Sequence, residues 1–183
     1  MCKYAMVKYK SHYACFNCCK TFKRRLWVDI KKGDEAGKEA KCPECAQLMA
    51  NMGKDFEAPK KDNLKAWAHI KNLYSVGVTF HSCGCTGPGY IPQDTERLIA
   101  YLQELHQDYH KQLNFWRERH EPTNEREIAR DKSKNWNYIT QIPVDAKSKK
   151  GSVVNEDAKN YWIGRIKDVE QKLFQIQNTA GKV

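Results

Sequence analysis

Apolar residues recur through the second half of the chain at the spacing of an α-helix. Between residues 94 and 120, and again between 155 and 178, they follow one another at steps of three and four. Such steps place the apolar side chains along one face of a helix. Asp94 or Thr95 can cap the first helix, and Asn155 can cap the second. The two stripes consist of Leu98, Leu102, Leu105, Tyr109, Leu113 and Trp116, and of Trp162, Ile166, Val169, Leu173 and Ile176.

Each stripe requires an apolar partner, and the simplest partner is the other stripe, packed antiparallel. The sequence therefore predicts a long helical hairpin over 94–183, a surface that also suits a protein partner. The connection between the two helices is long and basic. Within it, Thr123–Arg130 favours a short helix, whereas Trp136–Ile142 favours a strand because it is rich in β-branched and aromatic residues.

The N-terminal part of the chain shows a period of two, which is typical of a β-strand. Glycines at 33 and 37 then indicate a turn before a short returning strand. We therefore expect a small β region over residues 1–57. The alternating positions are Phe22, Arg24, Leu26, Val28 and Ile30 on one side, and Lys23, Arg25, Trp27 and Asp29 on the other.

Residues 58–93 indicate a smaller mixed segment. A helix over 63–75, capped by Asp62 or Asn63, is expected to end before Gly77. A brief strand is expected at Val78–His81, and the next nine residues hold three glycines and one proline, which favour a loop. Together with its neighbours, this segment predicts an α+β fold. The helix stripe consists of Leu64, Trp67, Ile70 and Leu73 or Tyr74.

Four cysteines in two Cys-x-x-Cys steps are the clearest chemical signal. Cys15 and Cys18 form one step, Cys42 and Cys45 form the other, and 23 residues separate the two. The spacing lets one tight turn present two sulfurs to the same ion, and Pro43 stiffens the second turn. Four thiolates complete a tetrahedral shell around one Zn²⁺. The sequence thus predicts one structural zinc ion, which would stabilise a region with few apolar residues.

The Cys15-x-x-Cys18 and Cys42-Pro-x-Cys45 frame resembles the broad class of zinc ribbons. The chain from this second step to Lys60, followed by Phe80–Gly89, also resembles small, poorly characterised bacterial zinc-ribbon proteins. The resemblance covers about residues 15–92. It implies a binding module, because zinc ribbons serve ribosomal proteins, polymerases and nucleic-acid enzymes, and it carries over no functional residues.

Positive charge is concentrated in the N-terminal part. Of the net charge of +10, residues 1–72 supply 16 Lys and Arg against 8 Asp and Glu, and residues 73–183 supply 16 against 14. This imbalance favours an acidic partner, most often nucleic acid. Lysine and arginine would pair with phosphates, and Phe22 and Trp27 would stack on unpaired bases, unless these rings pack inside the ribbon. The predicted contacts are Lys20, Phe22, Lys23, Arg24, Arg25, Trp27, Lys31, Lys32, Lys54, Lys60, Lys61, Lys147, Lys149 and Lys150.

Two further groups contain metal-binding residue types. His81, Cys83 and Cys85 could ligate a second metal, or they could pack as small side chains in the glycine-rich loop. His106 and His110 are four residues apart on the expected helix, close enough to share a metal. A solvated helix face is the simpler interpretation of this pair, because no carboxylate is evident beside it. The sequence has no motif of a nucleophile with an adjacent base, so binding without catalysis is favoured over a metalloenzyme.

The favoured interpretation is a zinc-stabilised RNA-binding protein, ribosomal or ribosome-associated, that prefers RNA over DNA and contacts ribosomal proteins. The alternatives are a DNA-binding accessory protein of replication or transcription, and a protein–protein adaptor that works through the helical hairpin. No apolar run approaches the ~18 residues of a membrane span, and no N-terminal stretch resembles a secretory signal. We therefore expect a cytoplasmic protein with reduced thiols and no membrane partner.

Overall fold

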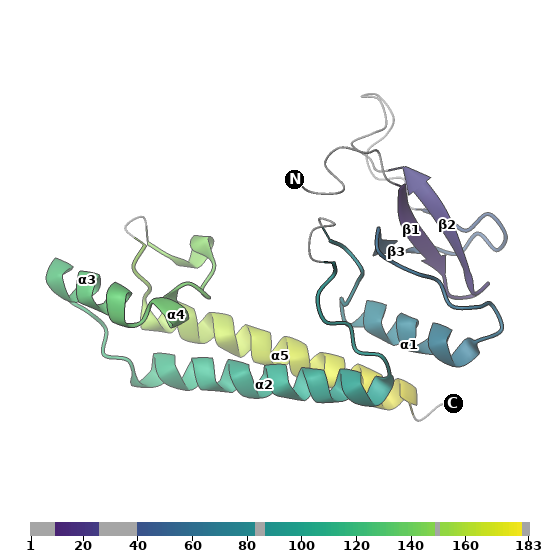
Figure 1. Ribbon diagram of the computed structural model, residues 1–183. Helices are drawn as coiled ribbons and strands as arrows, with labels where there is room; N and C mark the ends of the chain where they lie inside the picture. The colour runs from purple at the N-terminus through teal and green to yellow at the C-terminus, as the bar shows by residue number, and fades with distance from the viewer. Residues whose placement is uncertain (1–9, 26–39, 83–86, 149–150, 181–183) are drawn as a thin grey trace. The chain divides into compact units, whose positions relative to one another are not determined.

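A computed structural model describes the chain over residues 10–25, 40–82, 87–148 and 151–180 (Figure 1). The chain divides into two compact units, Met1–Leu98 and Ile99–Val183. A small antiparallel sheet together with helices confirms the α+β class. The elements are β1 (Lys10–Cys15), β2 (Lys20–Arg25), β3 (Ala50–Gly53), α1 (Leu64–Ser75), α2 (Thr95–Glu118), α3 (Glu125–Lys134), α4 (Trp136–Ile139), the 3₁₀ helix η2 (Val144–Ala146) and α5 (Asn155–Ala180).

The three strands form one antiparallel sheet in the order β2-β1-β3. β1 and β2 are joined by a tight turn, so that Cys15 lies opposite Lys20. On its other edge β1 pairs with β3, with one register shift. The strand predicted from residue 22 is observed as the last four residues of β2, up to Arg25, and the rest of that prediction lies outside the described residues.

An apolar cluster joins α1 to the sheet. Trp67 and Ile70 of α1 belong to the same buried cluster as Ala14 of β1 and Met52 of β3. The Trp67 side chain is 2% exposed, and its indole N–H donates to a backbone carbonyl at 3.2 Å, so its burial leaves no polar atom unpaired. This cluster is the core of the first unit.

The predicted helix over 63–75 is confirmed as α1. The Asn63 side chain accepts a hydrogen bond from the backbone N–H of Ala66, as an N-cap does, and Gly77 follows the helix with a φ of +81°. The stripe differs from the prediction at its first position. Leu64 is 66% exposed, so the buried face begins one turn later, at Trp67.

The segment predicted as a strand at 78–81 lies beside β3 without forming one. Phe80 donates its N–H to the carbonyl of Met52 at 2.8 Å and accepts from the N–H of Asp55 at 3.2 Å. The strand prediction is therefore wrong, although the backbone pairing that motivates such a strand is present. Gly53 makes this approach possible: an added Cβ would lie 2.5–2.6 Å from backbone atoms of Phe80 and His81.

Two long helices, α2 and α5, dominate the second unit, and their bounds match the two predicted helices closely (Figure 1). Tyr109 of α2 lies 5.3 Å from Trp162 of α5 between ring centroids, and its hydroxyl accepts a hydrogen bond from Arg165 at 2.6 Å. A buried cluster also takes Leu113 and Trp116 from α2 and Ala158, Trp162 and Ile166 from α5. A hairpin with continuous contact along both helices stays a prediction.

The connection between α2 and α5 contains helices rather than a strand. α3 confirms the short helix expected at 123–130, and the Asn124 side chain caps it. The strand expected at Trp136–Ile142 is wrong, because its first four residues form α4. Ile139 and Ile142 are both buried in the cluster of the second unit, whereas Trp136 is 59% exposed. A spacing of three between buried residues fits a helical turn and not a strand.

Arg119, directly after α2, joins three segments of the second unit. Its guanidinium pairs with Asp131 of α3 at 2.7 Å and donates to the Asn155 side chain at 2.5 Å. Asn155 returns a hydrogen bond to the Arg119 carbonyl at 2.7 Å. Asn155, expected as the N-cap, is the first residue of α5: its side chain contacts Arg119, and its own N–H donates to the Glu121 carboxylate.

Candidate metal centre

Two short turns carry the four cysteines of the Cys-x-x-Cys steps. Cys15 is the last residue of β1, and Cys18 lies in the turn that leads into β2. Cys42 and Cys45 lie in a second turn, closed by an isolated bridge between Lys41 and Leu48. Backbone hydrogen bonds inside this turn join Cys42 to the residues at 46 and 47 at 2.9 and 2.8 Å. Each turn therefore fixes its own pair of thiols.

The two turns share an uncommon backbone feature. The residue directly after the second cysteine of each step has a positive φ, 49° at Cys19 and 58° at Ala46. Residues other than glycine seldom adopt this conformation, and it reverses the chain sharply. In both turns the reversal comes immediately after the second cysteine.

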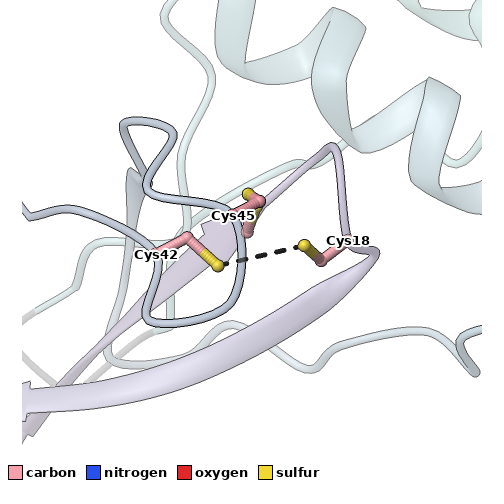
Figure 2. A group of neighbouring side chains, drawn as sticks. Cys18, Cys42 and Cys45 are labelled. Carbon is pink, nitrogen blue, oxygen red and sulfur yellow. Dashed lines mark hydrogen bonds between the residues drawn. The ribbon is translucent and has the colours of Figure 1, made fainter.

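The four sulfur atoms lie close enough to hold one metal ion. All four are within 4.8 Å of one another. Cys15 and Cys45 are 3.5 Å apart, and Cys18 and Cys42 are 4.0 Å apart. Figure 2 shows the thiols of Cys18 and Cys42 facing each other with Cys45 beside them. Tetrahedral zinc–sulfur bonds of ~2.3 Å require sulfurs ~3.8 Å apart, so the arrangement fits such an ion with small adjustments.

The surroundings of the thiols are apolar on the inner side. Cys15 and Cys42 are 0% and 3% exposed, and with Met49 they form a buried cluster. Half-buried side chains, including Tyr13 and Phe22, pack against it. With four protein ligands in such a shell, no coordination position remains for water or substrate. An ion held here would therefore be structural.

Close packing of the cysteines shifts the pKa of three of them. Hydrogen bonding to Cys45 raises the pKa of Cys18 to about 12, and burial raises the pKa of Cys15. The backbone N–H of Gln47 and the Asn17 side chain lower the pKa of Cys45 to about 6. Thiolates packed this closely repel one another, and a bound divalent ion removes that repulsion.

Two of the cations predicted to contact nucleic acid instead bind protein groups next to the cysteines. Lys20 forms an ion pair with Glu44, which lies between Cys42 and Cys45. Arg24 donates to the carbonyl of Lys41 at 2.6 Å. These contacts join β2 to the second cysteine turn. Phe22 packs against the cysteine cluster. This agrees with the alternative in which the ring packs inside the protein instead of stacking on a base.

The other residues predicted to contact nucleic acid differ in their exposure to solvent. Lys23, Lys60 and Lys61 are exposed, and Lys54 and Lys147 are half-buried. Arg25 ends β2. Trp27, Lys31, Lys32, Lys149 and Lys150 lie outside the described residues. Binding of nucleic acid by this set stays a prediction.

The second predicted metal group falls largely outside the described part of the chain. His81 is exposed, and Cys83 and Cys85 are not among the described residues, so that group stays a prediction. To the histidine pair noted in the sequence, the structure adds a carboxylate that the sequence did not indicate. Glu170 of α5 lies beside His106 and His110 of α2, and the three share the proximity expected of metal ligands. Only the packing of α2 on α5 brings this carboxylate to the histidines.

Comparison with known proteins leaves the cysteine site as the main guide to function. The chain matches no protein-family model, and no curated protein or solved structure is significantly similar to it. Over the residues that the structure describes, no helix combines the length and apolar character needed to cross a bilayer.

Proposed function

We propose that the four cysteines hold one structural Zn²⁺ and that the N-terminal unit is a zinc ribbon. The observation that carries this proposal is the proximity of four thiols from two turns, within 4.8 Å of one another. A tetrahedral site of four sulfurs suits zinc or iron, and metal analysis of the purified protein separates the two. One zinc per cysteine site is the expected result.

The proposed role of this unit is to bind RNA without catalysis. Residues 1–72 supply most of the net charge, and Lys23, Lys60 and Lys61 have exposed side chains there. Exposed lysines neutralise phosphates and release counterions, which gives affinity with little dependence on sequence. A fully ligated ion offers no site for chemistry, so its function is to hold the basic surface in one conformation. Association with the ribosome is the specific form of this proposal.

Neutralising the exposed lysines tests RNA binding. We expect the triple variant Lys23→Gln, Lys60→Gln, Lys61→Gln to bind structured RNA more weakly and with a smaller salt dependence. Each lost phosphate contact reduces the slope of log K against log salt by about 0.7–0.9, so three contacts reduce it by about 2–3. Arg24 is left unchanged because it also holds the carbonyl of Lys41. Fluorescence anisotropy over a range of salt concentrations measures both quantities.

A control variant removes the same charge from the other unit. Arg126→Gln, Lys134→Gln and Lys167→Gln replace exposed cations of α3 and α5. Equal loss of binding in both variants would show that net charge alone is responsible, and would overturn the assignment to the N-terminal unit. Stronger binding to duplex DNA at equal salt would select the DNA-binding alternative. Sedimentation of the native chain with ribosomal particles tests the association with the ribosome.

A further inference from the structure

We propose that His106 and His110 of α2 and Glu170 of α5 form a second metal site, selective for Zn²⁺ or a similar transition-metal ion. This site is independent of the four cysteines. It would link the two long helices of the second unit and would keep one coordination position open.

The three side chains converge from two helices. His106 and His110 lie on successive turns of α2, and their ring centroids are 4.5 Å apart. The Nε2 atom of His106 lies 3.2 Å from a carboxylate oxygen of Glu170. One ligand atom from each of the three residues lies within 4.8 Å of the others. Zinc bonds of ~2.0–2.1 Å in a tetrahedron place ligand atoms ~3.4 Å apart, so the arrangement needs only small side-chain rotations.

The helices hold these side chains from a fixed base. One turn from His106, Tyr109 contacts both Trp162 and Arg165 of α5. Further along α2, Leu113 enters the buried cluster that includes Ile166 of α5. Sites built on packed helices keep their geometry better than sites on loops. The side chains themselves are accessible, since His106 is 29% and Glu170 is 56% exposed, so an ion can enter from solvent.

The donor set determines which ion is suitable. Two imidazoles and one carboxylate favour zinc and its neighbours over calcium and magnesium, which prefer oxygen ligands. Three protein ligands leave a fourth tetrahedral position for water or for a ligand from another molecule. Without an ion, the hydrogen bond between His106 and Glu170 takes the place of coordination, and such an exposed pair contributes little to stability.

Titration of the full-length protein with Zn²⁺ tests the site. After the cysteine site has been filled with one equivalent, we expect the wild-type protein to bind a second equivalent by calorimetry. The same addition should raise the midpoint of thermal unfolding of the helices, because the ion stabilises the folded arrangement of α2 and α5. His110→Ala should abolish the second binding event, and Glu170→Gln should weaken it by at least ~10-fold.

Controls separate this site from others. His120→Ala removes an exposed histidine outside the cluster and should leave the second event unchanged. Titration with Co²⁺ distinguishes the sites by spectrum, because only thiolate ligands give sulfur-to-metal charge-transfer absorption. Cys42→Ser should weaken and shift that absorption, because only three thiolates remain, while the event at the histidines persists. Metal binding at the cysteine site and at the histidine site is thus measured independently.

Two results would overturn the proposal. One is a wild-type protein that binds a single equivalent and shows no further change in thermal unfolding. The other is a second equivalent that survives in the double variant His106→Ala, His110→Ala, which would place that ion elsewhere. Circular dichroism of each variant confirms that these accessible substitutions leave the helices folded.

Discussion

At the scale of single residues, Gly53 allows the backbone at Phe80 to approach β3 closely. Its φ is +96°, and a Cβ at this position would lie 2.5 Å from the carbonyl carbon and oxygen of Phe80. Contacts this short with backbone atoms cannot be relieved by turning a side chain. The absence of a side chain therefore allows the hydrogen bond between Phe80 and Met52.

We predict that Gly53→Ala destabilises the first unit by about 2–4 kcal/mol. Overpacking against fixed atoms costs about 1–3 kcal/mol, and a positive φ adds a further penalty of about 1 kcal/mol. Chemical denaturation of the metal-loaded protein measures this change in the free energy of unfolding.

Gly77→Ala is the matched control for Gly53→Ala. Gly77 also has a positive φ, +81°, but nothing lies within 4 Å of an added Cβ. Gly77→Ala should therefore lower the free energy of unfolding only by the backbone penalty of about 1 kcal/mol. Equal costs at the two positions would mean that the chain at Phe80 does not lie against β3 as described.

At the scale of elements, Arg119 holds α2, α3 and the start of α5 together. The residue is 9% exposed, and its guanidinium contacts Asp131 through two hydrogen bonds, at 3.2 and 2.7 Å. It also lies over the ring of Trp116 at 4.9 Å. A buried ion pair need not be stabilising in itself, but removing one member leaves the other charge unpaired.

We predict that Arg119→Met destabilises the second unit by about 3–5 kcal/mol, because the Asp131 carboxylate loses its counter-charge and the Asn155 side-chain oxygen loses its donor. Thermal unfolding followed by circular dichroism measures this effect. Arg117→Met is the control, since Arg117 is exposed on the same helix and should change stability by less than about 0.5 kcal/mol. Comparable losses in both variants would contradict the described contacts of Arg119.

The ion pair between Arg119 and Asp131 predicts that the stability of the second unit depends on pH in the acidic range. Burial alone would raise the pKa of Asp131, but the hydrogen bonds from Arg119 and Asn135 outweigh it and lower the pKa. A lowered folded pKa gives stability that is fully present above the unfolded value of about 3.9 and is lost as the pH falls through the folded value. Part of the wild-type stability of this unit should therefore disappear below about pH 4, and Arg119→Met should lack that part.

At the scale of the whole molecule, the cysteine site belongs entirely to one of the two units. All four ligands lie within Met1–Leu98, and the core of the second unit is assembled from residues of α2, α4 and α5 and the segment before α5. The sheet of the first unit has short strands of six, six and four residues. The sheet packs against α1 through a buried apolar cluster, and a metal ion held by the cysteines would add to its stability.

We predict that strong chelation of the metal unfolds the cysteine region and leaves the second unit folded. Hydrogen exchange should show loss of protection at the amides of β1 and β2 and of the turn at 42–47. Amides of α2 after Leu98 and of α5 should keep their protection. Retained protection in β1 and β2 after complete metal removal would show that the site does not depend on an ion.

The sequence by itself determined the features that depend on neighbours along the chain. Each Cys-x-x-Cys step forms one turn, so the spacing alone indicated that Cys15 and Cys18, and Cys42 and Cys45, would act in pairs. Asn63 likewise caps α1 through a residue three positions away, and the apolar stripes located the long helices. These are local interactions, and their geometry follows from the backbone periods of turns and helices.

Only the tertiary structure decided the features that join distant segments. The strand predicted at Trp136–Ile142 is helical in its first four residues, because Ile139 and Ile142 are buried in a cluster shared with α2 and α5. Glu170 reaches His106 because one face of α5 packs on α2, and no spacing in the sequence records that contact. Gly53 is required by a backbone segment that lies 27 positions later in the chain. Burial and close approach depend on which surfaces meet, and a pattern along one chain does not specify its partner.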